Sequence, residues 1–192
     1  GNDTFNVDSG TDIITLLGGD NSGAGGDSDV LVVSSGAIVN ASNINSFTAT
    51  GASSNSGTAN LSTKAAGGTI NMAASNSGAY NINGGAGDDI LTGGGGNDVF
   101  TVAATTEADD DTINGGAGTD TINLSTGTHT LDDDAKLANI ETIVANSSGS
   151  TLVLTNQAEG FTLIGGSGTD DFKGGSGADR SEERRVGKEC ER

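Results

Sequence analysis

Residues 84–101 read Gly-Gly-Ala-Gly-Asp-Asp-Ile-Leu-Thr-Gly-Gly-Gly-Gly-Asn-Asp-Val-Phe-Thr, which is one nine-residue pattern written twice in tandem. The pattern is G-G-x-G-x-D-x-U-x, where U is a large apolar residue, here Leu91 and then Phe100. Paired glycines permit a tight turn in which backbone carbonyls converge. The last three residues are expected to form a strand whose middle side chain points into a core.

The sixth position of the two copies is occupied by Asp89 and Asp98, which add carboxylates to the turn. Carboxylate and carbonyl oxygens favour a hard cation, and Ca²⁺ takes about six to eight of them. One turn cannot supply that number. We therefore expect two nonapeptides to form one coil of a solenoid, with each ion held between the turns of stacked coils.

This pattern resembles the RTX, or hemolysin-type, calcium-binding repeat family. The resemblance is strongest over residues 84–123 and 165–179, and it is weaker near the N-terminus. It implies an all-β fold, a right-handed parallel β-roll or β-solenoid of short strands and Gly-Asp turns. It also implies type I secretion of an unfolded chain that folds on meeting calcium, so the expected location is extracellular or on a bacterial-type cell surface.

The phase of the repeats predicts which turns meet in the stack. Residues 84–92 are expected beside residues 106–114, and residues 93–101 beside residues 115–123. Residues 102–105 would then be a four-residue insertion.

This stacking would let Asp89 share an ion with Asp111, and Asp98 share one with Asp120. With the weaker repeats included, the predicted calcium ligands are Asp3, Asp12, Asp89, Asp98, Asp111, Asp120, Asp170 and Asp179, with the turn glycines Gly85, Gly87, Gly94, Gly96, Gly116, Gly118, Gly166 and Gly168.

Two segments lie one nonapeptide before a clean repeat but carry an aromatic residue at the sixth position, Tyr80 in one and Phe161 in the other. They keep the apolar eighth position as Ile82 and Leu163. We interpret them as coils in which packing replaces the calcium turn.

Residues 34–83 are low in charge and rich in Ser, Asn, Ala, Gly and Thr. A disordered linker is the simplest alternative for such a composition. We favour solenoid coils without calcium, because short apolar runs recur and small polar side chains can form ladders between stacked strands.

Residues 137–143 carry Leu137 and Ile140 at a spacing that a short helix could use. Their Thr and Ile content favours strand instead, and they resemble segments that lie between calcium blocks in RTX proteins. The three aspartates at 132–134 are interpreted as a solvated turn rather than a site.

The C-terminal residues 180–192 differ abruptly from the rest, with five of the eight basic residues and the only cysteine, Cys190. They resemble translated sequencing-adapter read-through and are set aside from the fold. The predicted segments are degenerate RTX-type coils at 1–33, coils without calcium turns at 34–83, the main calcium-binding block at 84–123, divergent coils at 124–164, a truncated second calcium block at 165–179, and the artefactual tail at 180–192. The first and last repeats are incomplete, so both ends are expected to be cuts in a longer array.

The chain is strongly acidic, with a net charge of −18, and Leu, Ile, Val and Phe make up 38 of its 192 residues. Chains of this composition often stay disordered without help. The charge argues against nucleic acid and anionic membranes as partners. Without calcium the acidic turns repel one another, so we expect calcium binding to drive folding.

Catalytic signatures are missing, and no enzyme is predicted. His129 is the only histidine, which excludes H-E-x-x-H and His-rich zinc sites, and neither G-x-S-x-G, a P-loop nor an EF-hand loop occurs. No signal peptide, lipidation motif or membrane span is apparent.

Three functional classes follow from these observations. The first is a calcium-binding folding and secretion module of a larger toxin, hydrolase or other type I-secreted protein. The alternative is a surface-layer or adhesin-like structural protein, with neighbouring repeats of the same chain or lattice as partners. A polysaccharide-acting β-helix enzyme ranks third, because it would need an exposed acid/base cluster along a groove.

Overall fold

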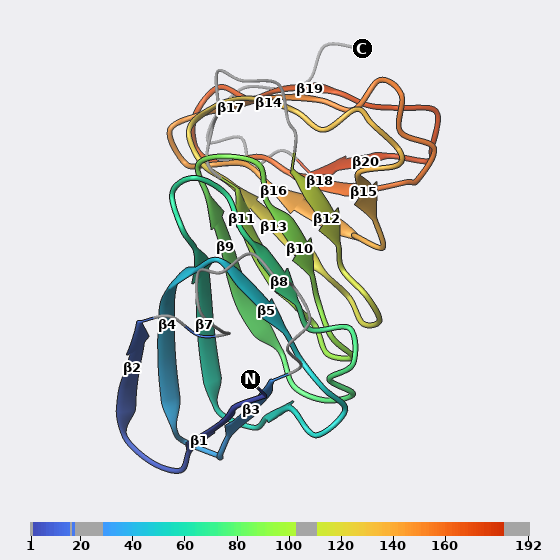
Figure 1. The fold of residues 1–192 in the computed structure, drawn as a ribbon. Coiled ribbons are helices and arrows are strands. Elements are labelled where there is room, and N and C mark those ends of the chain that lie inside the picture. Colours follow the sequence, from blue (N-terminus) through green and yellow to red (C-terminus); the bar gives the residue numbers. More distant parts are fainter. Residues whose placement is uncertain (1, 16, 18–28, 103–110, 183–192) are drawn as a thin grey trace.

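The structure is a computed structural model that describes residues 2–15, 17, 29–102 and 111–182. Every regular element in this part of the chain is a strand, and the strands form four parallel sheets (Figure 1). The largest sheet has the order β2 (Thr11–Thr15), β4 (Ile38–Ile44), β7 (Thr58–Thr63), β9 (Tyr80–Gly85), β11 (Val99–Val102), β13 (Thr121–Leu124), β16 (Thr142–Val144), β18 (Thr162–Ile164) and β20 (Arg180–Glu182).

The other three sheets complete the coils. A five-stranded sheet has the order β15 (Leu137–Ala138), β12 (Thr112–Asn114), β10 (Ile90–Thr92), β8 (Thr69–Asn71) and β5 (Ser46–Thr48). The two three-stranded sheets are β1 (Thr4–Val7), β3 (Val30–Val33) and β6 (Ser54–Asn55), and β14 (Gly127–Thr130), β17 (Ser150–Val153) and β19 (Asp171–Lys173).

Each coil adds one strand to the largest sheet, so the prediction of an all-β, parallel β-solenoid is confirmed. Asn81 pairs with Val99, which lies 18 residues later, as two nonapeptides per coil require. The next coil is longer, because Val99 pairs with Thr121. Residues 103–110, which include most of the expected insertion, lie outside the described residues.

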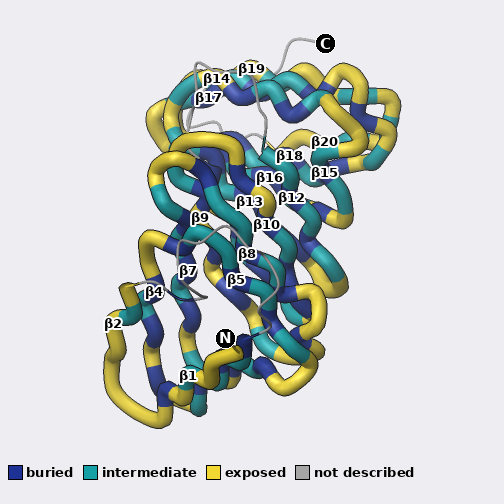
Figure 2. The backbone as a smooth tube through the Cα atoms, in the orientation of Figure 1, coloured by how far each residue is buried: buried dark blue, intermediate teal, exposed yellow. Residues whose placement is uncertain are grey.

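The buried apolar residues form one core cluster that extends from Val7 to Leu163. Buried positions accordingly recur along the whole stack (Figure 2). The eighth positions of the main repeats supply Leu91, Phe100 and Ile122, each fully buried. Strand geometry explains this placement, since the middle residue of each short strand points inward and its two neighbours point outward.

Residues 34–83 are part of the same stack and contain β4 to β8 and the start of β9. The segment at 137–143 contributes β15 and the start of β16, so the strand interpretation is confirmed there. In the part of the chain that is described, no helix has the length and apolarity needed to cross a membrane.

Candidate calcium sites

The two acidic turn pairs predicted from the repeat phase lie next to each other in the stack. Strand β10 pairs with β12, and β11 pairs with β13. The backbone N–H of Asp89 donates to Oδ1 of Asp111 (2.8 Å), and the N–H of Asp98 donates to Oδ1 of Asp120 (2.7 Å). The predicted stacking is therefore confirmed for residues 93–101 beside 115–123, and for the described part of residues 84–92 beside 106–114, since residues 106–110 lie outside the described residues. The sharing of an ion within each pair stays a prediction.

The same contact recurs along the solenoid as a carboxylate ladder, in which a sixth-position carboxylate accepts the N–H of the equivalent residue one coil earlier. The further donor and acceptor pairs are Gly68 and Asp89 (2.7 Å), Tyr80 and Asp98 (2.7 Å), Asp120 and Glu141 (2.7 Å), Ser150 and Asp170 (2.9 Å), and Phe161 and Asp179 (3.1 Å). The ladder satisfies backbone donors that would otherwise be buried without a partner.

Tyr80 and Phe161 occupy the sixth position as packing residues, as the sequence predicted. Both side chains are buried, and each backbone N–H donates to the aspartate of the following coil. The Tyr80 hydroxyl lies 2.7 Å from Ser75 Oγ, so its polar end is satisfied inside the core.

The second carboxylate oxygen distinguishes two kinds of acidic turn. In what we call the closed turns, Oδ2 accepts the N–H of the second glycine of its own repeat. The three closed pairs are Gly94 with Asp98 (2.6 Å), Gly166 with Asp170 (2.9 Å) and Gly175 with Asp179 (3.0 Å). In the two open turns, Oδ2 of Asp89 and of Asp120 is buried and has no hydrogen-bond partner.

Burial perturbs these carboxyl groups. Desolvation raises the pKa of Asp89 to about 6 and that of Asp98 to about 6. Backbone hydrogen bonds partly offset the effect, from Gly68 to Asp89 and from Tyr80 and Gly94 to Asp98. The pKa of Asp120 is raised as well, mainly by burial and also by Glu141. The Thr63 hydroxyl lies near Asp89 and lowers its pKa in part. That hydroxyl donates its hydrogen bond to the Asn83 carbonyl (3.4 Å). No such hydroxyl acts on the pKa of Asp120, which is therefore the less ambiguous of the two open turns.

Each carboxylate lies against the first glycine of its repeat. A Cβ on Gly93 would come within 2.3 Å of Asp98 Oδ2, and one on Gly115 would come within 2.5 Å of Asp120 Oδ2. The sequence prediction named the second and fourth glycines and missed the first. The signal was available, because every clean repeat begins with Gly-Gly.

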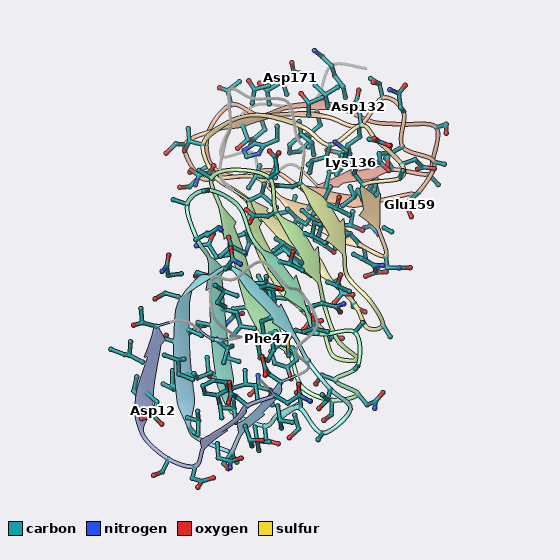
Figure 3. All side chains as sticks on the ribbon, viewed as in Figure 1. Asp12, Phe47, Asp132, Lys136, Glu159 and Asp171 are labelled. Atoms are coloured by element: carbon teal, nitrogen blue, oxygen red, sulfur yellow. The ribbon has the colours of Figure 1, made fainter. Side chains whose placement is uncertain are left out.

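The N-terminal predictions have different outcomes in the structure. The N–H of Asp3 donates to Oδ1 of Asp29 (2.8 Å), which is buried and was not predicted because the repeat spacing is lost there. Asp12 lies within β2 rather than in a turn, and it is exposed at the edge of the largest sheet (Figure 3).

The sequence analysis also missed two glutamates in or near the carboxylate ladder, because the nonapeptide pattern has Asp at its sixth position. Glu141 takes the sixth position of its coil. Glu159 is half-buried, its Oε2 has no hydrogen-bond partner, and burial together with Asp134 and Glu141 raises its pKa. Its side chain lies on the same side of the stack as Lys136 (Figure 3).

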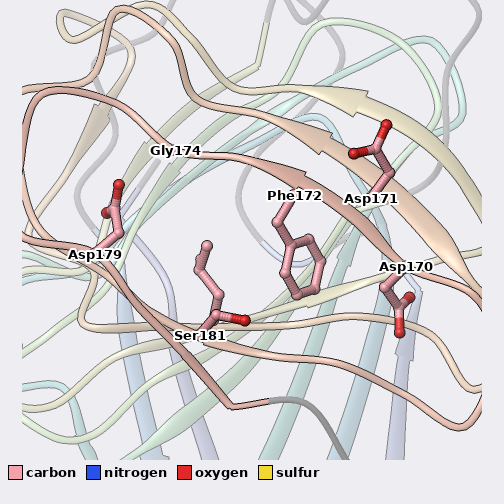
Figure 4. Close-up of a pocket in the computed structure, with 7 residues that line it drawn as sticks. Asp170, Asp171, Phe172, Gly174, Asp179 and Ser181 are labelled. Carbon is pink, nitrogen blue, oxygen red and sulfur yellow. The ribbon is translucent and has the colours of Figure 1, made fainter. Parts of the chain in front are cut away.

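A cavity of about 340 Å³ opens at the last described coil, and the Phe172 ring points into it (Figure 4). Asp170 and Asp179 lie on its wall. Both are in closed turns, and their predicted role as calcium ligands stays a prediction.

The donor set fits a hard cation. Oxygen is the only ligand type at the paired turns, and two buried carboxylate oxygens lack partners. Among the described residues, no three His, Cys, Asp or Glu side chains gather as a metal-binding group. An ion at a turn pair would therefore take the rest of its ligands from backbone carbonyls and water.

Comparison with known proteins agrees with this chemistry. A family model for the RTX calcium-binding nonapeptide repeat matches four segments, residues 1–22, 76–103, 104–128 and 162–180. No curated protein and no solved structure matches the chain. The matched segments contain both open turns and all three closed turns.

Proposed function

Because the chain belongs, over these four segments, to the RTX calcium-binding nonapeptide repeat family, we propose that it binds calcium between stacked turns and that binding drives its folding. The observation that carries this proposal is the pair of buried, unpartnered carboxylate oxygens on Asp89 and Asp120. A buried charged oxygen without a partner costs on the order of 1–3 kcal/mol or more. A bound cation removes that cost.

Calcium suits these turns better than magnesium does. Mg²⁺ demands near-ideal octahedral geometry and gives up its water reluctantly, whereas Ca²⁺ accepts irregular sets of carbonyl and carboxylate oxygens. Two stacked turns with only paired carboxylates form such an irregular set.

The charge of the main block explains why folding depends on the ion. Residues 84–123 contain eight acidic residues and no lysine or arginine. A ligand that binds only the folded chain converts its binding free energy into folding free energy. Extracellular calcium modules bind with Kd of about 10⁻⁴–10⁻³ M, so the block would stay unfolded in a low-calcium cytosol and fold outside the cell.

We assign the chain to a folding and secretion module of a larger secreted protein of type I systems. We assign no catalytic role to it, although the protein that contains it could be an enzyme. The surface-layer or adhesin-like alternative is favoured by one observation, the uncharged side-chain ladder Asn40, Asn60 and Asn81, which links coils without any cation.

The test combines titration calorimetry with circular dichroism on the full 192-residue chain. We expect heat on adding Ca²⁺ and a rise in β-type signal that Mg²⁺ does not reproduce. Asp89→Asn with Asp120→Asn should remove most of both effects, while Asp132→Asn, in the turn at 132–134, serves as the matched control and should leave them unchanged. A spectrum that ignores both calcium and chelator would overturn the proposal.

A further inference from the structure

The residue that precedes each Gly-Gly pair separates the open turns from the closed ones. Asn83 and Asn114 precede the open turns of Asp89 and Asp120. The closed turns are preceded by Thr92, Ile164 and Lys173. This ninth position of the previous repeat is variable in the pattern, and it lies outside the turn itself.

A competition for one backbone N–H explains the correlation. In the open turns, Asn83 Oδ1 accepts the N–H of Gly85 (3.0 Å), and Asn114 Oδ1 accepts the N–H of Gly116 (3.0 Å). Asparagine commonly caps the backbone two residues on in this way. In the closed turns, the equivalent N–H donates to the aspartate Oδ2, as Gly94 does to Asp98 (2.6 Å).

The backbone follows the same division. Gly85 and Gly116 have φ of 55° and 91°, in the left-handed region that glycine tolerates. The second glycines of the closed turns, Gly94, Gly166 and Gly175, do not have positive φ. The asparagine therefore holds its turn in a different conformation, and the aspartate loses its local donor.

We propose that Asn83 and Asn114 are positioning residues that select which acidic turns bind calcium. Each accepts the glycine N–H that would otherwise donate a hydrogen bond to the aspartate Oδ2. This inference rests on the proposed calcium function and adds which residues determine where calcium binds. In each stacked pair, one aspartate is then left with an oxygen free for the ion. Beside Asp120, the partner Asp98 has both carboxylate oxygens already accepting an N–H, from Tyr80 and from Gly94. Beside Asp89, Oδ1 of the partner Asp111 accepts the Asp89 N–H.

Replacing the asparagine by the residue of a closed turn gives the sharpest test. Asn83→Thr and Asn114→Thr should each free the glycine N–H to donate to Asp89 or Asp120. Calcium affinity at the altered turn should fall roughly tenfold or more, as is typical when the outer shell of a metal site is changed. The calcium-free chain should melt at a higher temperature, because the buried oxygen gains a partner. Asn83→Thr is the cleaner variant for that readout, since Asn114 also accepts from the side chain of Asn139 (2.8 Å).

The reverse exchange tests the same idea as a gain of binding. Thr92 lies in register between Asn71 and Asn114, so an asparagine fits its column. Thr92→Asn should take the Gly94 N–H from Asp98. We expect tighter calcium binding and a lower melting temperature without calcium.

Asn71→Thr is the matched control. Asn71 Oδ1 accepts the N–H of Ala73 (3.0 Å), with the same spacing, but no aspartate lies in the turn that follows. This variant should leave calcium affinity unchanged. Calorimetry with Ca²⁺ and melting in chelator are measured for all four variants and the unsubstituted chain.

The outcomes separate the two proposals. If the unsubstituted chain binds no calcium, the proposed function fails and the selection role fails with it. If it binds calcium and the Asn83→Thr and Asn114→Thr variants bind it equally well, or melt at a lower temperature than the unsubstituted chain in chelator, the asparagines are simple turn caps. Only this inference is then overturned.

Discussion

Residues 34–83 and residues 84–123 share one solenoid and differ almost completely in the chemistry of their turns. The first segment has no acidic residue and one lysine, whereas the second has eight acidic residues and no lysine or arginine. Their strands are nevertheless neighbours in the same sheets, since β9 pairs with both β7 and β11. Strand and core set the fold, and turn chemistry sets what the fold needs in order to be stable.

The neutral segment joins its coils with uncharged side chains. Asn60 donates to Asn40 (2.8 Å) and accepts from Asn81 (2.8 Å) on the outer face of the largest sheet. Inside, Ser75 Oγ donates to the carbonyl of Ser53 (3.0 Å). None of these groups repels its neighbour, so no ion is required.

The acidic segment joins its coils with the carboxylate ladder. The backbone gains good acceptors, but the ladder places Asp98 next to Asp120, and Asp89 next to Asp111, at a cost in repulsion and desolvation. Calcium dependence should therefore be confined to this segment.

Calcium removal should produce the largest difference in stability between the two segments. At calcium concentrations about 10–100 times Kd, each ion adds about 1.4–2.7 kcal/mol, so two ions add about 3–5 kcal/mol. Hydrogen exchange with and without chelator should show faster exchange in β10 to β13 and little change in β4 to β7, because repeat proteins open locally. Equal acceleration in both segments would mean that the stack unfolds as one unit.

A matched pair of core truncations should show what the segments share. Leu61 in β7 and Leu91 in β10 are both fully buried. Leu61→Ala and Leu91→Ala should each cost about 3 kcal/mol with calcium bound, as buried leucine truncations do. Chemical denaturation in saturating calcium measures both. A much smaller loss at Leu91 would indicate a looser core in the acidic segment.

In the absence of calcium, protonation of the buried aspartates should stabilise the acidic segment. Asp89 and Asp98 have pKa values of about 6 in the folded chain, raised from 3.8. The folded state then holds more protons than the unfolded state between these values, so the calcium-free chain loses stability as pH rises from about 4 to about 6. Each of the two carboxyl groups contributes at most about 3 kcal/mol to this loss, and calcium stabilisation should grow over the same window.

Melting in calcium-free buffer at several pH values measures this effect, and Asp89→Asn with Asp98→Asn should flatten the profile. Stability that rises with pH across this window would show that these carboxylates are not desolvated as the structure indicates.

The sequence predicted the features of the solenoid that follow from the nine-residue period. Two nonapeptides per coil place Val99 18 residues after Asn81 and bring Asp98 beside Asp120. Apolar eighth positions such as Leu91 and Ile82 predicted the core. These features depend only on strand alternation and on a fixed period.

The rest depends on contacts that the period does not specify. Coils longer than 18 residues interrupt the regular spacing of the repeats. For this reason the contact between Asp3 and Asp29, which are 26 residues apart, could not be predicted. The open and closed turns differ by a single N–H that either Asn114 or Asp120 can accept, and the nonapeptide pattern treats position nine as variable. Such a competition between two acceptors is decided only when the turn geometry is known.

The smallest expected effect comes from the neutral ladder. Asn60→Ala removes two side-chain hydrogen bonds that are partly exposed to solvent, so it should cost about 1 kcal/mol. The cost should be the same with calcium and with chelator, because no ligand of the proposed sites contacts Asn60. Chemical denaturation under both conditions measures it, with the outward-facing Thr58→Ala on the same strand as a control. If the cost grows when calcium is bound, the ion stabilises coils two layers away, and the division between an ion-dependent and an ion-independent segment fails.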